Sequence, residues 1–208
     1  MIRGIVLAAG ASSRMGQAKA ALPIGTTGET VAGRVVQTLL AAGLPSVTVV
    51  AGAHIDAVRA AMPANEPRVS VVEHPGWAQG QLSSLLAGLA AVDDPQLEAI
   101  LVTLVDVPLV RPDSVAAIVR AWRESRAPIV RPVDGERHGH PVVFDRAVFD
   151  DLRRADPNVG AKAVFAIHAS QRLDVPIADP GAFVDMDTPD EYRTVLDRAE
   201  RDQKDPSR

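Results

Sequence analysis

Short apolar segments alternate with amphipathic segments along most of the chain. The apolar segments are rich in Val and Ile, and the amphipathic ones are rich in Ala and Leu. This alternation predicts βα units around a mostly parallel sheet. The predicted strands are Ile5 to Ala9, Val47 to Ala51, Val69 to Glu73, Ala99 to Val105, Ile129 to Pro132, Val142 to Phe144 and Phe183 to Asp185. The predicted helices are Val31 to Ala42, Ile55 to Met62, Gln81 to Val92, Asp113 to Glu124, Arg146 to Ala155, Ala161 to Ala169 and Pro189 to Gln203.

Local signals support several of these boundaries. The run "AILVTLV" is nearly continuous in apolar residues, as in a central strand that is covered on both faces. Gly43 and Pro45 form a helix stop, and Thr188 and Pro189 form a helix start. We therefore expect one domain over residues 1–198, followed by a charged tail over residues 199–208 that frays into solvent.

Composition excludes several classes of function. The chain has 208 residues, 47% of them hydrophobic, and a formal net charge of −4, so we expect no broad basic face for nucleic acid or anionic lipid. There is no cysteine, which excludes disulfides and thiolate metal sites and suits a reducing cytoplasm. No apolar run approaches the ~20 residues that span a bilayer. The expected protein is cytoplasmic and binds neither membranes nor nucleic acids.

The loop after the first predicted strand combines small residues with two cations. Main-chain N–H groups in "AAGASS", together with a helix N-terminus, would favour an anion. Arg14 adds a planar fork for phosphate oxygens, and Lys19 adds a compact ammonium group. The spacing of Gly10 and Gly16 does not match a Walker A motif, and Ser12 breaks the dinucleotide fingerprint. The loop is either a phosphate cradle of another kind or an ordinary turn whose cations face water.

Asp106 follows the apolar run "ILVTLV" at the carboxyl end of a predicted strand. Ligands of open α/β sheets bind at this edge, so Asp106 and the Gly10 loop define one candidate cleft. An aspartate there suits Mg²⁺, which prefers carboxylate and phosphate oxygens. The alternative is an Asp that caps the turn before Pro108.

Other polar motifs are less specific. His138 and His140 lack a third ligand at the usual spacing, so we expect no zinc site. No serine lies in a nucleophile elbow, and no histidine pair has metalloprotease spacing.

Five ordered motifs resemble the MobA-like nucleotidyltransferases, and the resemblance extends over nearly the whole chain. They are "LAAGASSRMGQAKAALP" with Ala21 in place of the usual Leu, "PGWAQGQLSSLLAGL", "LVDVPLV", "GERHGHPVVF" and "VDMDTPDEY". Family members add a nucleotide to molybdopterin, and more distant relatives activate sugars and isoprenoid precursors. The resemblance implies an α/β class with a Rossmann-like three-layer α/β/α sandwich.

The resemblance also implies the roles of individual residues. Asp106 and Asp187 would bind Mg²⁺, with Asp185 as the competitor for the second position. His140 would bind the acceptor, with Arg137, Asn158, Gly160 and Lys162 as further candidates. Gly80, Ser83 and His74 would lie near the nucleotide, although Gly80 and Ser83 also suit an ordinary turn before a helix and a lone histidine such as His74 is more often structural. The implied catalytic residues are Arg14, Lys19 and Asp106, and the implied nucleotide-binding residues are Leu7, Ala8, Ala9, Gly10, Arg14, Lys19, Gly80, Ser83 and Asp106.

The motifs are most similar to those of the cytidylyl branch. This branch transfers CMP from CTP to the terminal phosphate of molybdopterin and releases pyrophosphate. Ala9 supports CTP, because the guanosine-using branch tends to have glycine there and a methyl group leaves less room for a purine. The implied partners are CTP, a molybdopterin-type acceptor, and a molybdenum hydroxylase or its insertion chaperone. Three alternatives stay open: a guanylyltransferase or other NTP transferase with a different phosphorylated acceptor, an NAD(P)H-dependent oxidoreductase of the same fold, and a nucleotide-binding protein without turnover.

Overall fold

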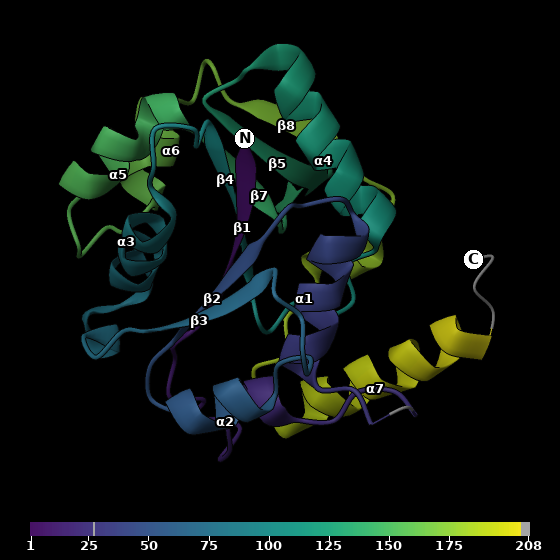
Figure 1. The fold of residues 1–208 in the computed structure, drawn as a ribbon. Helices are drawn as coiled ribbons and strands as arrows, with labels where there is room; N and C mark the ends of the chain where they lie inside the picture. The colour runs from purple at the N-terminus through teal and green to yellow at the C-terminus, as the bar shows by residue number, and fades with distance from the viewer. Residues whose placement is uncertain (27, 205–208) are drawn as a thin grey trace.

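A computed structural model describes residues 1–26 and 28–204 (Figure 1). Within this part of the chain, eight strands form one mixed sheet in the order β3-β2-β1-β4-β7-β5-β6, and β8 pairs with β5. The strands are β1 (Ile2–Ala8), β2 (Val47–Ala51), β3 (Val69–Glu73), β4 (Ala99–Leu104), β5 (Ile129–Asp134), β6 (Arg137–His138), β7 (Val142–Asp145) and β8 (Leu173–Pro176).

The first four strands in the order form the parallel part of the sheet. Strand β1 pairs in parallel with β2 and β4, and β2 pairs in parallel with β3. Strand β7 runs antiparallel to both β4 and β5, whereas β8 is parallel to β5. The carboxyl ends of β1 and β4 therefore lie together at one edge of the sheet, as the sequence predicts for the cleft.

Helices cover both faces of the sheet, which confirms the three-layer α/β fold (Figure 1). Residues of α1 and α4 share one buried cluster with α2 and α7, and residues of α3, α5 and α6 share the other. The helices are α1 (Val31–Ala41), α2 (Ile55–Ala60), α3 (Gln81–Val92), α4 (Pro112–Ser125), α5 (Phe149–Arg154), α6 (Lys162–Ile167) and α7 (Pro189–Lys204).

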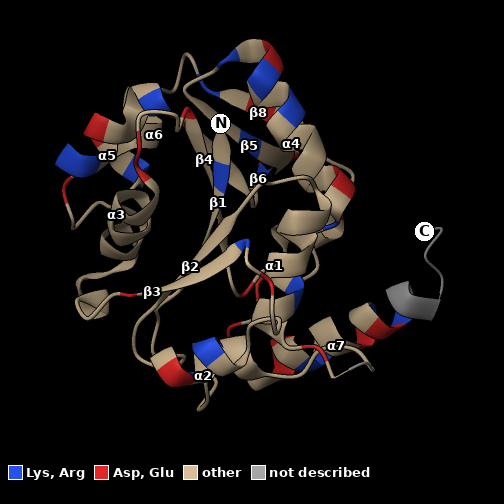
Figure 2. Cartoon of the chain, viewed as in Figure 1, with Lys and Arg blue, Asp and Glu red and all other residues tan. Residues whose placement is uncertain are grey.

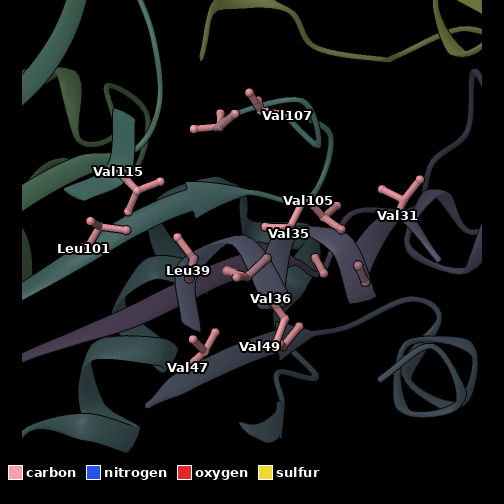
Figure 3. Close-up of a cluster of buried hydrophobic side chains, with 14 of the residues drawn as sticks. Val31, Val35, Val36, Leu39, Val47, Val49, Leu101, Val105, Val107 and Val115 are labelled. Atoms are coloured by element: carbon pink, nitrogen blue, oxygen red, sulfur yellow. The ribbon is translucent and has the colours of Figure 1, made fainter. Parts of the chain in front are cut away.

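The packing follows the apolar pattern of the chain. Figure 3 shows Val35 and Leu39 of α1 in a buried cluster with Val49 of β2 and Leu101 of β4, and all four are nearly inaccessible to solvent. Figure 2 shows charged residues on outer helices such as α4, α5 and α7, whereas the central strands carry few of them. Because the strands are covered on both faces, their Val and Ile runs carry little of the alternation that one-sided sheets show.

Several parts of the chain differ from the sequence prediction. The predicted strand Phe183 to Asp185 is wrong: the 3₁₀ helix η4 (Pro180–Phe183) leads into an irregular segment, whose backbone bonds to a loop rather than to a strand. The short strands β6 and β8 were not predicted. Helix α7 continues to Lys204 and Ala199 is fully buried, and residues 205–208 of the tail predicted over residues 199–208 lie outside the described residues.

None of the described helices has the length and apolar character needed to cross a membrane.

Candidate active site

A pocket of about 360 Å³ opens at the carboxyl ends of β1 and β4. Ala8, Ala9 and Gly10 line it from the end of β1, and Asp106 lines it from the turn after β4. The predicted nucleotide-binding residues Leu7, Lys19 and Gly80 also line this pocket. The structure therefore brings together most of the residues that the sequence assigned to the nucleotide.

The loop after β1 differs in detail from the expected phosphate cradle. The N–H groups of Met15 and Gly16 both donate to the carbonyl oxygen of Ser12, so they are engaged within the loop. The expected helix N-terminus is wrong, because only the three-residue 3₁₀ turn η1 (Lys19–Ala21) follows the loop and α1 begins at Val31. Formal positive charge beside the loop comes from the side chains of Arg14 and Lys19.

Lys19 lies between two carboxylates from distant parts of the chain. Its ammonium nitrogen is 3.3 Å from Asp106 Oδ2 and also contacts Asp187 Oδ1. Only 9% of Lys19 is exposed, which excludes the reading that this cation faces water. Its main-chain N–H donates to Ser12 Oγ at 3.3 Å, and this bond attaches the backbone of Lys19 to the loop after β1. A buried ammonium group is stable here because two carboxylates neutralise it.

Arg14 approaches the same cluster from solvent. Its Nη2 donates to Asp187 Oδ2 at 2.6 Å, and 67% of its side chain is exposed. Asp187 thus binds one cation with each oxygen, Lys19 with Oδ1 and Arg14 with Oδ2. An exposed Arg can leave such a pair at little cost, because surface ion pairs contribute about 0–1 kcal/mol.

The two carboxylates have opposite electrostatic environments. Burial raises the pKa of Asp106 above its usual value, and the attraction of Lys19 opposes this shift only in part. The hydrogen bond from Lys19 lowers the pKa of Asp187. In the described part of the chain, Asp106 Oδ1 is buried and has no hydrogen-bond partner. This oxygen is a buried acceptor that a ligand group or cation would satisfy.

Helix α7 holds Asp187 at its N-terminal side. Thr188 Oγ1 accepts from the N–H of Glu191, and Glu191 Oε2 accepts from the N–H groups of Thr188 and Asp187 at 2.8 Å each. This capping box fixes the backbone of Asp187 directly before the helix. Asp185 is exposed and, within the described residues, makes no hydrogen bond or ion pair with Lys19, but its charge raises the pKa of Asp106. Geometry thus favours Asp187 over Asp185 as the partner of Asp106.

The two serines at the start of α3 have different surroundings. Ser83 Oγ donates to the carbonyl oxygen of Gly80 at 2.7 Å and lies 2.9 Å from His74 Nε2. Neither His74 nor Ser83 is among the described residues that line the first pocket, whereas Ser84 lines it. Gly80 precedes the helix with φ of 103°, a conformation that favours glycine. Ser83 and His74 thus brace this turn, and Ser84 is the hydroxyl on the pocket side.

A second pocket of about 610 Å³ adjoins the first, since Leu7, Gln81 and Leu104 line both. Of the predicted acceptor residues, four line it: His140, Asn158, Gly160 and Lys162. Arg137 does not; its guanidinium lies 5.2 Å from the ring centroid of Phe183 and pairs with Asp134. The floor is apolar, and Arg131 and Lys162 bring positive charge, with no carboxylate among the described lining residues.

His140 presents an unusual polar group to this pocket. Burial lowers the pKa of its imidazole, and a hydrogen bond to the main chain of Val102 opposes the shift. Within residues 1–26 and 28–204, its Nδ1 is buried without a hydrogen-bond partner. A neutral imidazole nitrogen of this kind is available to a polar ligand.

Several lining residues escaped the sequence prediction. Trp77 and His54 line the first pocket, and Arg131 and Phe165 line the second, where the guanidinium of Arg131 lies 5.4 Å from the Phe165 ring centroid. For His54 and Phe165 no motif gives a signal, because they reach the cleft through tertiary packing. The motif indicated Ser83, whereas the serine that lines the first pocket is its neighbour Ser84.

The described residues contain no cluster of three or more His, Asp or Glu side chains that would form a complete metal site. Asp106 and Asp187 nevertheless fit Mg²⁺, because this ion typically takes one or two protein carboxylates and completes its shell with phosphate and water. The unpartnered Asp106 Oδ1 lies beside the same ammonium group that contacts Asp187. These donors are suited to a metal that arrives together with a phosphate ligand.

Three curated relatives match most of the chain. It is 32% identical to a nicotine blue oxidoreductase of Paenarthrobacter nicotinovorans, over 94% of this chain and 96% of that protein. It is 28% identical to the molybdenum cofactor cytidylyltransferase of Escherichia coli K12, over 93% and 95% of the two chains. It is 31% identical to a molybdenum cofactor guanylyltransferase of Rhizobium meliloti, over 91% and 88%.

Solved structures and a family model agree with these relatives. The crystal structure of Rv0371c from Mycobacterium tuberculosis H37Rv in complex with manganese is 31% identical, with a TM-score of 0.70, and the match covers 94% of this chain and 98% of that one. The model of the MobA-like NTP transferase domain matches residues 4–174, which include the Gly10 loop, Lys19, Asp106 and both pockets. Asp187 lies beyond this match. The chain therefore belongs to the MobA-like NTP transferase family.

Proposed function

We propose that this protein transfers CMP from CTP to the terminal phosphate of a molybdopterin-type acceptor and releases pyrophosphate. The observation that carries the proposal is the position of Lys19, whose ammonium group is held between Asp106 and Asp187 at the pocket formed by the Gly10 loop. Two carboxylates and a buried ammonium group are suited to hold a metal-bound triphosphate.

The first pocket would take the nucleotide. Ala8, Ala9 and Gly10 line it from the end of β1, and Gly80 and Ser84 line it from the start of α3. Ser84 supplies a hydroxyl that a base or ribose can use. Arg14 would exchange its contact with Asp187 for the phosphates, and Lys19, which has three N–H donors, would add a phosphate contact while it stays beside the carboxylates.

Asp106 and Asp187 would hold Mg²⁺ in this scheme. When bound, the ion would neutralise charge on the phosphates and orient them. The manganese complex of the similar M. tuberculosis protein supports a divalent cation. Lys19 would stay beside both carboxylates and lower their mutual repulsion.

The reaction needs no protein base. A terminal phosphate monoester is largely ionised at neutral pH, so its oxygen can attack the α-phosphorus directly. The lone pair of this oxygen forms the new P–O bond, and the bond between the α-phosphorus and the oxygen that bridges to the β-phosphate breaks. Pyrophosphate leaves with that electron pair. The protein contributes position and charge, from Lys19, Arg14 and Asp106.

The second pocket would take the acceptor. Its apolar floor suits a planar ring system, and the positive charges of Arg131 and Lys162 suit a phosphate. His140 Nδ1 supplies a buried polar group that the ring or phosphate of the acceptor would satisfy. Because the two pockets share Leu7, Gln81 and Leu104, a phosphate in one lies next to a triphosphate in the other.

CTP is favoured over GTP by Ala9. This residue is buried and lines the first pocket, so its methyl group takes up space beside the ligand. The relatives include both cytidylyl and guanylyl transferases, so the choice of base rests on this residue and its surroundings. The product would pass to a molybdenum hydroxylase or its insertion chaperone in the cytoplasm.

An NAD(P)H-dependent oxidoreductase is the second candidate. The observation that favours it is the 32% identity to nicotine blue oxidoreductase over 94% of the chain, together with the apolar second pocket. Hydride transfer, however, needs neither Asp106 nor Asp187, and it leaves the buried Lys19 cluster without a purpose. A binder without turnover would need neither carboxylate in this arrangement.

The test is a panel of CTP, GTP, ATP and UTP, each incubated with Mg²⁺ and molybdopterin or its molybdenum form, with product mass as the readout. A parallel reaction with NADPH and an oxidised dye follows absorbance at 340 nm. A cytidylylated product supports the proposal. Formation of another dinucleotide replaces CTP with that nucleotide, and oxidation of NADPH without any dinucleotide product overturns the transferase assignment.

A further inference from the structure

Asp179 is a buried carboxylate outside both pockets. Only 3% of it is exposed, although its side chain carries a charge. Its Oδ2 accepts from the N–H of Arg111 at 2.9 Å and from Ser114 Oγ at 2.7 Å. Its Oδ1 accepts from the N–H of Gly181 at 3.0 Å, and Arg111 Nε lies 3.6 Å away. A buried carboxylate is stable only when its oxygens accept hydrogen bonds, and both oxygens of Asp179 do so.

These partners join two segments that carry the candidate metal ligands. Arg111 and Ser114 belong to the start of α4, directly after the loop that begins at Asp106. Gly181 belongs to η4, which leads to Asp187. Asp179 therefore connects the segment that contains Asp106 to the segment that contains Asp187.

The two segments run antiparallel along their whole contact. Asp179 contacts Arg111 at one end, and the N–H of Met186 donates to the carbonyl oxygen of Asp106 at 2.9 Å at the other. Between these points the backbones touch, since a Cβ atom at Gly181 would lie 2.0 Å from the carbonyl oxygen of Leu109. Only glycine permits this approach. The register of residues 179–186 against residues 106–111 is thus fixed at three places.

The same segment also reaches the second pocket. The N–H of His140 donates to the carbonyl oxygen of Ala182 at 2.9 Å. A displacement of residues 180–186 would consequently move His140 as well as Asp187.

We propose that Asp179 is a positioning residue, which holds Asp187 opposite Asp106 and His140 at the second pocket by locking residues 179–186 onto residues 106–111. The inference rests on the proposed function for its effect on metal and catalysis, but its structural part stands independently. Asp179 touches neither pocket in the described residues, so it acts through Asp187 and His140.

The test compares Asp179→Asn with a matched control, Asp145→Asn. Asp145 also accepts from a buried side chain, Trp122 Nε1 at 2.9 Å, and from the N–H of Ala147, but it pairs with Ala99 at the opposite end of β4. An asparagine at position 179 must turn its NH₂ group towards an N–H donor, either Gly181 or Arg111, so one half of the lock is lost.

Three readouts are measured on the full chain. Amide hydrogen exchange by NMR reports on Met186 and His140, and free-Mn²⁺ EPR in the presence of the α,β-methylene analogue of CTP reports on metal affinity. Steady-state kinetics separates kcat from KM. In Asp179→Asn we expect exchange at both amides to accelerate about tenfold, from the loss of one or two buried hydrogen bonds. We expect Mn²⁺ affinity to fall about tenfold, as for other residues that orient a metal ligand. The value of kcat should fall while KM for CTP changes less than about twofold, because Asp179 does not line the nucleotide pocket.

Asp145→Asn should leave all three readouts at wild-type values. The proposal is overturned if the Met186 amide of Asp179→Asn exchanges at the wild-type rate and the variant binds Mn²⁺ with wild-type affinity. If Asp179→Asn does not fold, Ser114→Ala is the second variant, because it removes one donor and leaves the carboxylate of Asp179 with its other donors. It should shift the same readouts in the same direction. Wild-type values in Ser114→Ala would overturn the proposal. A wild-type protein that binds no Mn²⁺ contradicts the proposed metal site, and the exchange rates alone then decide the role of Asp179.

Discussion

The ammonium group of Lys19 contacts the carboxylate of Asp187, which lies 168 positions later in the chain. This contact joins the loop after the first strand to the segment before the last helix. Asp106 completes the cluster from the turn after β4. Three distant segments thus meet at one point, and the following predictions test what that point does.

Asp106→Asn should lower kcat by roughly 100-fold or more, the order observed when one group that stabilises transition-state charge is removed. The amide has nearly the same shape, and the raised pKa of Asp106 shows that burial already disfavours its charge, so the fold should be retained. Pyrophosphate release and circular dichroism provide the measurements, with Asp145→Asn as the control. A variant with near-native turnover would eliminate the two-carboxylate site.

Lys19→Met should weaken CTP binding by roughly tenfold or more, because a charge-assisted hydrogen bond contributes about 1.5–3 kcal/mol. It should also destabilise the protein by about 1–3 kcal/mol, since Asp106 and Asp187 would then repel each other without a buried cation. Isothermal titration and urea unfolding measure the two effects. Arg14→Met is the comparison. Its exposed ion pair predicts a stability loss below about 1 kcal/mol. Equal stability losses in both variants would contradict the assigned burial of Lys19.

Ser84→Ala should raise the KM for CTP by about fivefold, the equivalent of one lost hydrogen bond of about 1 kcal/mol. Ser83→Ala should affect the KM less, because its hydroxyl faces Gly80 and His74 rather than the pocket. Steady-state kinetics on both variants gives the answer. The reverse order would restore Ser83 as the nucleotide contact, as the sequence motif suggested.

Ala9→Gly should raise the ratio of kcat/KM for GTP to that for CTP by roughly tenfold, since one methyl group in a fitted pocket is worth about 1–3 kcal/mol of discrimination. Ala9 is buried at the end of β1 and lines the first pocket, so its removal opens space next to the ligand. Competition between the two triphosphates in one reaction measures the ratio. An unchanged ratio would show that another residue selects the base.

Asp174 gives a prediction about pH. The hydrogen bond from Arg131 lowers its pKa from 3.8 to about 2, so the charged form is stabilised in the folded state. This contribution is present above about pH 4 and is lost as the pH falls towards 2. Because 34% of the Asp174 side chain is exposed, we expect roughly 1 kcal/mol rather than the full value of the shift.

Asp174→Asn should therefore unfold at lower urea concentration than wild type at pH 7, and the difference should shrink as the pH approaches 2.5. The same variant should weaken acceptor binding, since Asp174 holds Arg131 at the second pocket. A difference in urea midpoint that stays constant with pH would show that the carboxylate charge does not contribute.

The sheet could be predicted well because its physical cause is local. Runs such as Val47 to Ala51 and "AILVTLV" are apolar apart from one threonine each, and this pattern distinguishes buried strands from the amphipathic helices that cover them. Asp106 could be predicted for the same reason, as a charged residue directly after a buried strand. The helices that cover the two faces of the sheet could be predicted from the periodic spacing of their apolar residues.

The failures come from contacts between distant residues. The strand expected at Phe183 to Asp185 gave way to a segment that binds residues 106–111, and nothing near residue 183 encodes that partner. The motif does not distinguish Ser83 from Ser84. Successive helical residues point about 100° apart, and the sequence alone does not say which of the two faces the cleft. Asp179 had no signal at all, since its partners Arg111 and Ser114 lie more than sixty positions away.

The antiparallel contact of residues 179–186 with residues 106–111 has a consequence for biosynthesis. At about 5–20 residues per second, roughly 10–30 s separate the translation of Lys19 from that of Asp187. The residues that line the two pockets end at Phe165, so all of them are translated before Asp187, and until Asp187 follows, Asp106 is the one of the two carboxylates that can pair with Lys19. Asp187 is thus the last member of the charged cluster to be synthesised, and it comes directly before α7, whose Val195 and Ala199 complete the buried core.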